Sequence, residues 1–265
     1  MLRISLQTDS SRPDELPAIN ANSTMTMITL LSRSTLILIA LLPIAWAGPG
    51  DGIQGTAHDF SVIEGSSSGL CVFCHTPHAA QKQGLLWNHT LSQNTFSWDT
   101  VETVAGTPYP TFQGDTYTGP TAKCLSCHDG SVAIGDVIWW NGGPPSAPLI
   151  DTRVTGTAQT ASSSGRMGHN HPVAMPYPWN NMPSTYNGVT TGSGVMLNEY
   201  QTNPEALGIR LYNDVGGGVI RAGAVAGQTG IECSSCHDPH NNVGVEGNAF
   251  LLGTPANLCS KCHAK

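Results

Sequence analysis

Cys71-Val72-Phe73-Cys74-His75 is the first of four copies of one five-residue pattern, in which two cysteines are separated by two residues and followed directly by a histidine. The other copies are Cys124-Leu125-Ser126-Cys127-His128, Cys233-Ser234-Ser235-Cys236-His237 and Cys259-Ser260-Lys261-Cys262-His263. C-x-x-C-H is the pattern that attaches a c-type haem. Its two thiols form thioether bonds with the haem vinyl groups, and its histidine becomes the proximal ligand of the iron.

Two other kinds of site share part of this pattern. A C-x-x-C pair is also half of a zinc site or a thioredoxin-like redox motif. Neither explains a histidine after every second cysteine, which in a chain with 10 histidines has a chance probability on the order of 10⁻⁶. The motifs use all 8 cysteines, so none remains for a disulfide. The sequence therefore predicts four covalently bound haem c groups, attached through Cys71, Cys74, Cys124, Cys127, Cys233, Cys236, Cys259 and Cys262, with proximal iron ligands His75, His128, His237 and His263.

The N-terminal part of the chain has the pattern of an export signal. An apolar run at 36–44 ends at Ala45-Trp46-Ala47, a small-x-small pattern typical of signal-peptide cleavage. The run is well short of the ~20 apolar residues that a membrane-spanning helix needs. We therefore expect residues 1–47 to be an N-terminal extension and signal peptide, and residues 48–265 to form a single tetrahaem domain without a membrane span.

Composition predicts a fold with little regular structure. Charged residues make up 11% of the chain, against about 25% in ordinary soluble domains. A chain with 30 Gly and 18 Pro cannot build a large core from its own side chains, so we expect the haems to supply the missing apolar mass. The predicted fold class is a mostly irregular, loop-rich multihaem cytochrome with short helices and a few short strands, organised around four haems. The formal net charge of −7 argues against nucleic acid as a partner.

Two segments have local patterns that predict strands. The β-branched and aromatic residues at 132–140 predict one strand. Residues 209–212 and 219–221 flank a turn-rich stretch and predict a hairpin. The rest of the interval 150–229 is expected to be mostly loop, and no well-capped helix longer than about three turns is predicted.

Six histidines remain as candidates for the sixth coordination position of the four irons. They are His58, His78, His89, His169, His171 and His240. His78 and His240 each follow a proximal histidine by three residues, with a proline between. A ring so near in sequence leaves the backbone on the same side of the haem as the proximal ring, and the proline turns the chain away. We therefore predict that both ligate a neighbouring haem.

The other two positions are assigned with alternatives. His171 is preferred to His169 because the following proline makes it more rigid. His58 is the fourth predicted distal ligand. It follows the flexible stretch 48–52, so two arrangements remain open, with His58 serving a haem of its own chain or of a neighbouring subunit. His89 has packing or hydrogen bonding as an alternative role. Methionine ligation also remains open, through Met167, Met175, Met182 or Met196.

The surroundings of the motifs resemble a known family. Residues 231–240 and 257–263 resemble the doubled C-x-x-C-H module of multihaem cytochromes, and residues 71–78, 86–88 and 124–130 are similar to the same group. Four motifs in this order resemble the filament-forming tetrahaem cytochromes of the OmcE type. This resemblance implies a subunit that polymerises into an extracellular wire of stacked bis-histidine haems, in which a neighbouring subunit can donate one axial histidine.

The sequence thus predicts an electron carrier without catalytic residues. All four proximal histidines are present and further histidines are in surplus, so each iron can be six-coordinate with no open position for a substrate. The expected partners are copies of the same chain in a homopolymeric filament, other redox proteins and extracellular electron acceptors. The expected location is extracellular or at the cell surface. The alternatives are a soluble periplasmic shuttle and a multihaem reductase, which needs a five-coordinate iron.

Overall fold

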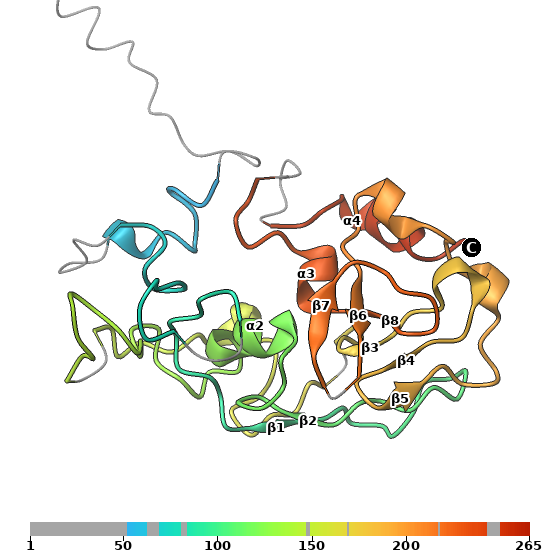
Figure 1. Cartoon of the computed structure of the whole chain (residues 1–265), viewed down its shortest axis with the longest axis horizontal. Coiled ribbons are helices and arrows are strands. Elements are labelled where there is room, and N and C mark those ends of the chain that lie inside the picture. Colours follow the sequence, from blue (N-terminus) through green and yellow to red (C-terminus); the bar gives the residue numbers. More distant parts are fainter. Residues whose placement is uncertain are drawn as a thin grey trace, which may run out of the picture. The chain divides into compact units, whose positions relative to one another are not determined.

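The segments that carry the motifs are connected by short helices, short strands and long irregular stretches (Figure 1). The computed structural model describes residues 52–62, 69–80, 84–146, 149–168, 170–216, 218–242 and 250–265. These residues lie in one compact unit, Ala47–Lys265. The predicted signal peptide lies outside the described residues. Within the described residues, no helix has the length and apolar character needed to cross a membrane.

Three of the four motifs lie in short helices. The helix α2, Pro120–His128, contains the second motif, and α3, Cys233–Cys236, contains both cysteines of the third. The helix α4, Pro255–Leu258, continues into the 3₁₀ helix η6, Cys259–Lys261, in the fourth motif. Both α2 and α4 begin with proline, whose missing N–H costs nothing in the first turn. The remaining described helices are 3₁₀ turns: η1 (Phe60–Val62), η2 (Gly156–Ala158), η3 (Trp179–Asn181), η4 (Leu197–Glu199) and η5 (Pro204–Leu207).

The described strands form three small antiparallel sheets. The largest has the order β3-β8-β6-β7 and contains β3 (Met175–Pro176), β8 (Thr229–Ile231), β6 (Tyr212–Asp214) and β7 (Ile220–Ala222). The others pair β1 (Thr95–Phe96) with β2 (Phe112–Gln113), and β4 (Thr185–Tyr186) with β5 (Val189–Thr190). Because β8 ends one residue before α3, the central strand of the largest sheet fixes the start of the third motif (Figure 1).

The predicted hairpin is confirmed, since β6 and β7 pair antiparallel with Asn213 opposite Arg221. The predicted strand at 132–140 is wrong. The backbone N–H of Ile134 donates to Thr152, and that of Ile138 donates to Asn88. Because two loops take up its hydrogen-bonding groups, this segment forms isolated bridges in place of a ladder, and its β propensity is overridden by tertiary contacts.

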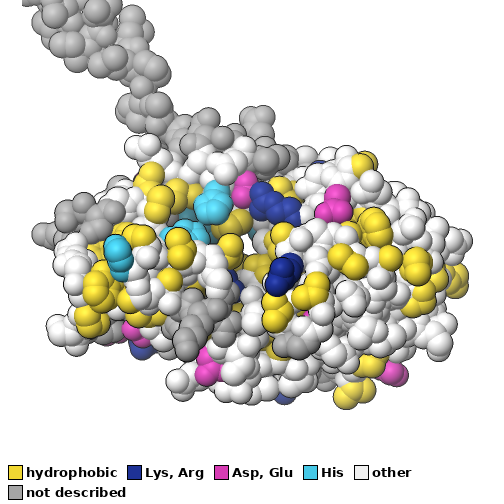
Figure 2. Space-filling view, in the orientation of Figure 1, with side chains coloured by type: hydrophobic (Ala, Val, Ile, Leu, Met, Phe, Trp, Pro, Cys, Tyr) yellow, Lys and Arg dark blue, Asp and Glu magenta, His cyan; other side chains and the backbone are white. Residues whose placement is uncertain are grey.

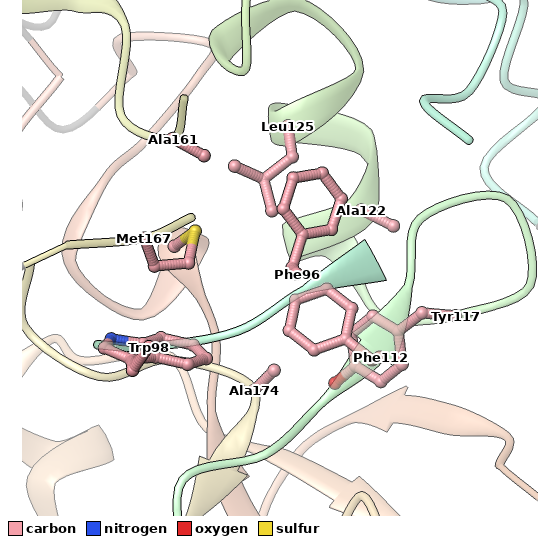
Figure 3. Packing of buried hydrophobic residues seen from close by; sticks show 9 residues of the cluster. All are labelled: Phe96, Trp98, Phe112, Tyr117, Ala122, Leu125, Ala161, Met167 and Ala174. Carbon is pink, nitrogen blue, oxygen red and sulfur yellow. The ribbon is translucent and has the colours of Figure 1, made fainter. Parts of the chain in front are cut away.

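Among the described residues, buried side chains form three clusters, and each cluster includes or contacts a residue from a motif. The largest contains Phe96, Trp98, Phe112, Tyr117, Ala122, Leu125, Ala161, Met167 and Ala174 (Figure 3). Leu125 lies between the two cysteines of the second motif, and Phe73, in the second cluster, lies between those of the first. In the third cluster, Cys262 packs against Tyr177, Ile209 and Leu211. Apolar packing around the motifs therefore holds these loops in place.

Gly230 in β8 lies too close to the buried Tyr186 ring to accept a side chain. A Cβ at this position would lie 2.2 Å from Cγ of Tyr186. We expect Gly230→Ala to lower the free energy of unfolding by about 1–3 kcal/mol, because the ring must shift in a packed core. Gly143→Ala is the matched control, since its Cβ would meet no atom within 4 Å. Thermal unfolding followed by circular dichroism measures both, and equal melting temperatures would contradict the packing argument.

Candidate haem-attachment site

Motifs that are successive in the sequence have cysteines that lie near one another in the structure. Burial, followed by the nearby thiol of Cys74 in the first motif, raises the pKa of Cys127 in the second motif to about 12. A hydrogen bond with the Cys124 thiol, together with burial, raises the pKa of Cys233 in the third motif well above its usual value. The first and second motifs therefore lie within electrostatic range of each other, and the second and third motifs meet through the Cys124 and Cys233 thiols.

Cysteines of the third and fourth motifs also lie near one another. Burial raises the pKa of Cys236 to about 11, with smaller contributions from Cys233 and from Cys259 of the fourth motif. Burial also raises the pKa of Cys262 to about 12, and Cys236 adds to that rise. Within the described parts of the chain, no three His, Cys, Asp or Glu side chains converge as a zinc site of protein ligands requires.

Three proximal histidines each lie opposite a predicted distal histidine. The ring centroids are 6.1 Å apart for His75 and His240, 6.1 Å for His128 and His58, and 6.4 Å for His263 and His171. An imidazole nitrogen lies about 2 Å from a bound transition metal, so two rings on opposite sides of one metal have centroids roughly 6 Å apart. The three gaps therefore have the width of a bis-histidine iron site.

Hydrogen bonds of Nδ1 leave the metal-binding nitrogen free in four of these rings. The four Nδ1 atoms face backbone carbonyls as follows: His75 and Leu85 at 2.6 Å, His128 and Ala158 at 2.6 Å, His58 and Pro239 at 3.3 Å, His171 and Pro172 at 2.9 Å. A carbonyl can only accept, so Nδ1 carries the proton and Nε2 carries the lone pair. Hydrogen bonds of this kind orient metal-binding histidines. The donor set therefore fits an iron ligated by imidazole.

The carbonyl that holds His75 comes from a left-handed turn. Leu85 and Leu86 have φ angles of 58° and 52°, a conformation that costs a non-glycine residue about 1–2 kcal/mol. The Leu86 carbonyl accepts from Thr76, directly after His75. Two adjacent carbonyls of the turn thus form hydrogen bonds with the His75 ring and with the backbone that follows it.

His89 is buried, and its environment differs from that of the ligand candidates. Its Nδ1 lies 2.8 Å from the Thr90 carbonyl and its Nε2 lies 3.0 Å from the Ala133 carbonyl. Because each ring nitrogen lies against a carbonyl oxygen, neither nitrogen is directed at an open metal position. Its Nε2 also lies 3.4 Å from Sγ of Cys127. His89 therefore packs beside a haem-attachment cysteine, and hydrogen bonding is its role in this structure.

The fourth proximal histidine has a different neighbourhood. Burial lowers the pKa of His237, and the nearby His128 lowers it further. Within the described residues, no ring contact joins His237 to a distal candidate. His78 is exposed, and the alternative ligand His169 lies outside the described residues. Met167 and Met175 are buried, and Met167 belongs to the largest apolar cluster.

One short segment, His237-Asp238-Pro239-His240, provides groups that act at three of the motifs. It contains the third proximal histidine, the ring that faces His75, and the carbonyl that orients His58. Asp238 holds the segment, because this buried carboxylate lies 3.1 Å from the Arg210 guanidinium. One face of the molecule has a hollow with His side chains on one side and Lys or Arg side chains on the other (Figure 2).

Sequence reasoning missed three buried carboxylates that hold the motifs. Asp129 follows His128 and accepts hydrogen bonds from Ser92, Asn94 and Ser131. Asp238 follows His237, and Glu232 precedes Cys233. The sequence signal for Asp129 and Asp238 is their shared position, directly after the proximal histidine of the second and third motifs. Glu232 forms a capping box with Ser235 in which the acid comes first, the reverse of the usual Ser/Thr-x-x-Glu order.

Comparison with known proteins agrees with the motif analysis at the C-terminal end. The sequence model of the doubled CXXCH motif family matches residues 224–265, which include the third and fourth motifs. No curated protein matches the chain. The family match supports a multihaem c-type cytochrome, in which C-x-x-C-H motifs bind haem c covalently for electron transfer.

His89 makes stability depend on pH. Burial lowers its pKa below the ordinary value of 6.5. The unfolded chain therefore binds a proton that the folded chain rejects, so stability falls as pH drops below about 6.5, by up to about 1.4 kcal/mol per pH unit. His89→Gln should reduce this slope. Guanidinium unfolding between pH 7.5 and 5.5 measures it, and an unchanged slope in the variant would disprove the assignment.

Proposed function

We propose that this protein is an electron-transfer subunit that holds four haem c groups in a row and assembles into an extracellular filament. The observation that carries the proposal is the set of three proximal–distal histidine pairs with gaps of iron-site width. Each distal ring comes from outside the motif that supplies its proximal ring. Such pairing between segments joins the motifs into one continuous unit.

The protein's contribution is to position the ligands and keep the irons closed. Bound haem supplies a one-electron iron couple whose potential depends on axial ligands, hydrogen bonds and burial. The three facing imidazole pairs would hold an iron from both sides and would leave no site there for a substrate. Nδ1 bonds to backbone carbonyls hold the rings at fixed orientation, which keeps the ligand geometry the same in both oxidation states. These features favour electron transfer.

The row of motifs supports conduction along the chain. Cysteines of successive motifs lie near one another: Cys74 near Cys127, Cys124 hydrogen-bonded with Cys233, and Cys236 near Cys259. A haem attached at each motif would lie beside the next. We assign the sixth position opposite His237 to His78, because the other three predicted distal histidines already face proximal rings. The signal-like segment and the resemblance to filament-forming cytochromes support export and assembly.

His58 lies inside its own chain in this structure. Its ring faces His128 and stacks on Phe250 with centroids 4.4 Å apart. Burial lowers its pKa, so the ring is neutral and able to ligate at neutral pH. Of the two arrangements open from the sequence, we therefore propose the one in which His58 serves a haem of the same chain.

A second candidate function, a multihaem reductase, rests on one observation. His237 faces no distal imidazole within the described segments. A five-coordinate iron at this motif would leave a position open for a small substrate. Electron paramagnetic resonance of the oxidised protein separates the two candidates, because an electron carrier shows only low-spin irons and a reductase shows a high-spin signal that changes with added nitrite or hydroxylamine.

Substitution of His240 tests whether its ring ligates the same iron as His75. We expect His240→Ala to retain four haem masses in the mass spectrum and to convert one of the four irons to high-spin, because His75 loses its opposite ring. His89→Gln is the control and should leave every iron low-spin. In a chain that also lacks the first haem, through Cys71→Ala and Cys74→Ala, the His240 change should add no high-spin signal. A signal that persists there would assign His240 to another haem.

Assembly is tested on the secreted protein. Negative-stain electron microscopy of the extracellular fraction should show filaments that contain covalently bound haem. A monomeric tetrahaem protein confined to the periplasm would support the shuttle instead.

A further inference from the structure

The Glu232 carboxylate is buried at the contact between the second and third motifs. It has no exposed surface. Its Oε1 accepts from the Tyr117 hydroxyl and, at 2.5 Å, from the Tyr186 hydroxyl. Its Oε2 accepts from the Thr121 N–H at 3.0 Å, and the Ser235 N–H completes the capping box. Four donors therefore converge on one side chain.

These contacts favour the ionised form of Glu232. Thr121 is in the first turn of α2, where the helix dipole favours a negative charge. Gly119, the N-cap residue of α2, has no side chain with which to cap the helix, and Glu232 does so in its place. Burial raises the pKa of Glu232 above its ordinary value, and the bonds from Thr121, Tyr117 and Tyr186 offset part of that rise. A carboxylate that accepts several N–H and O–H bonds is stabilised as an anion.

The charge lies beside two haem-attachment cysteines. Glu232 directly precedes Cys233, whose N–H donates to Thr121 Oγ1 at 3.1 Å. The Cys233 thiol in turn contacts the Cys124 thiol. Lys123, which precedes Cys124, is 4% exposed and donates to the Thr118 carbonyl at 3.0 Å. One buried carboxyl group and one buried amine thus flank the junction of the two central motifs.

We infer that Glu232 sets the reduction potentials of the two central haems, acting as a fixed buried negative charge that favours the oxidised irons. The inference rests on the proposed haem attachment. A ferric haem has one more positive charge than a ferrous haem, so a nearby anion lowers the potential. Lys123, of opposite charge, raises it. Neither residue touches the iron, so both tune a couple that the axial histidines establish.

Glu232→Gln tests this inference with little change in shape. The Gln oxygen can accept from the two backbone N–H groups, and the tyrosine hydroxyls can turn to accept from its amide. In a potentiometric titration at neutral pH, we expect two of the four one-electron steps to move to higher potential. The expected size is roughly tenfold in the reduction equilibrium, which is about 59 mV. Lys123→Met should move the same two steps in the opposite direction.

The controls separate this inference from the proposed function. Glu102→Gln removes an exposed carboxylate and should leave all four steps unchanged. Each variant is first weighed by mass spectrometry. Four haems with unmoved potentials in both Glu232→Gln and Lys123→Met would overturn the inference alone, and absence of covalent haem from the second and third motifs in the wild-type protein would overturn it together with the proposed function.

Discussion

The hydrogen bonds of the Glu232 carboxylate connect the two central motifs. The same side chain caps α2, which contains the second motif, and begins α3, which contains the third. The two tyrosines that donate to it extend this connection, because Tyr117 belongs to the largest apolar cluster and Tyr186 lies in β4. A buried carboxylate is costly unless its lone pairs are satisfied. Its four donors must therefore stay together, and they fix one motif relative to the other.

The segment His237-Asp238-Pro239-His240 extends this arrangement to the first motif. Its two histidines and one carbonyl serve three different motifs, so a small displacement would disturb several ligand positions at once. Asp238 prevents this through Arg210 and through the N–H of Asn242 at 2.8 Å. Asp129 plays the equivalent part after the second motif. Buried aspartates next to proximal histidines therefore do the positioning that long helices do in other proteins.

Little regular structure is needed because the motif residues themselves take part in packing. Leu125 and Phe73, the variable residues of two motifs, belong to apolar clusters that also include residues distant in sequence. Backbone carbonyls of loops orient the His75 and His128 rings, which a helix interior could not do because its carbonyls are already bonded. An irregular chain thus suits the proposed task of holding several ligands around a row of haems.

The sequence alone determined the features that depend on neighbouring residues. The C-x-x-C-H motifs can be read directly because attachment chemistry requires that spacing, and the β6–β7 hairpin follows from its local turn. The same reasoning predicted that His240 would leave its own motif, because the proline after Asp238 turns the chain. Only the tertiary structure decided that its ring faces His75, that His58 faces His128 of the same chain, and that His89 has both nitrogens against carbonyls. It also replaced the expected strand at 132–140 with bonds to two loops, and it gathered four donors around Glu232. These outcomes depend on contacts between residues far apart in the chain, and local propensity contains no information about which distant groups will meet.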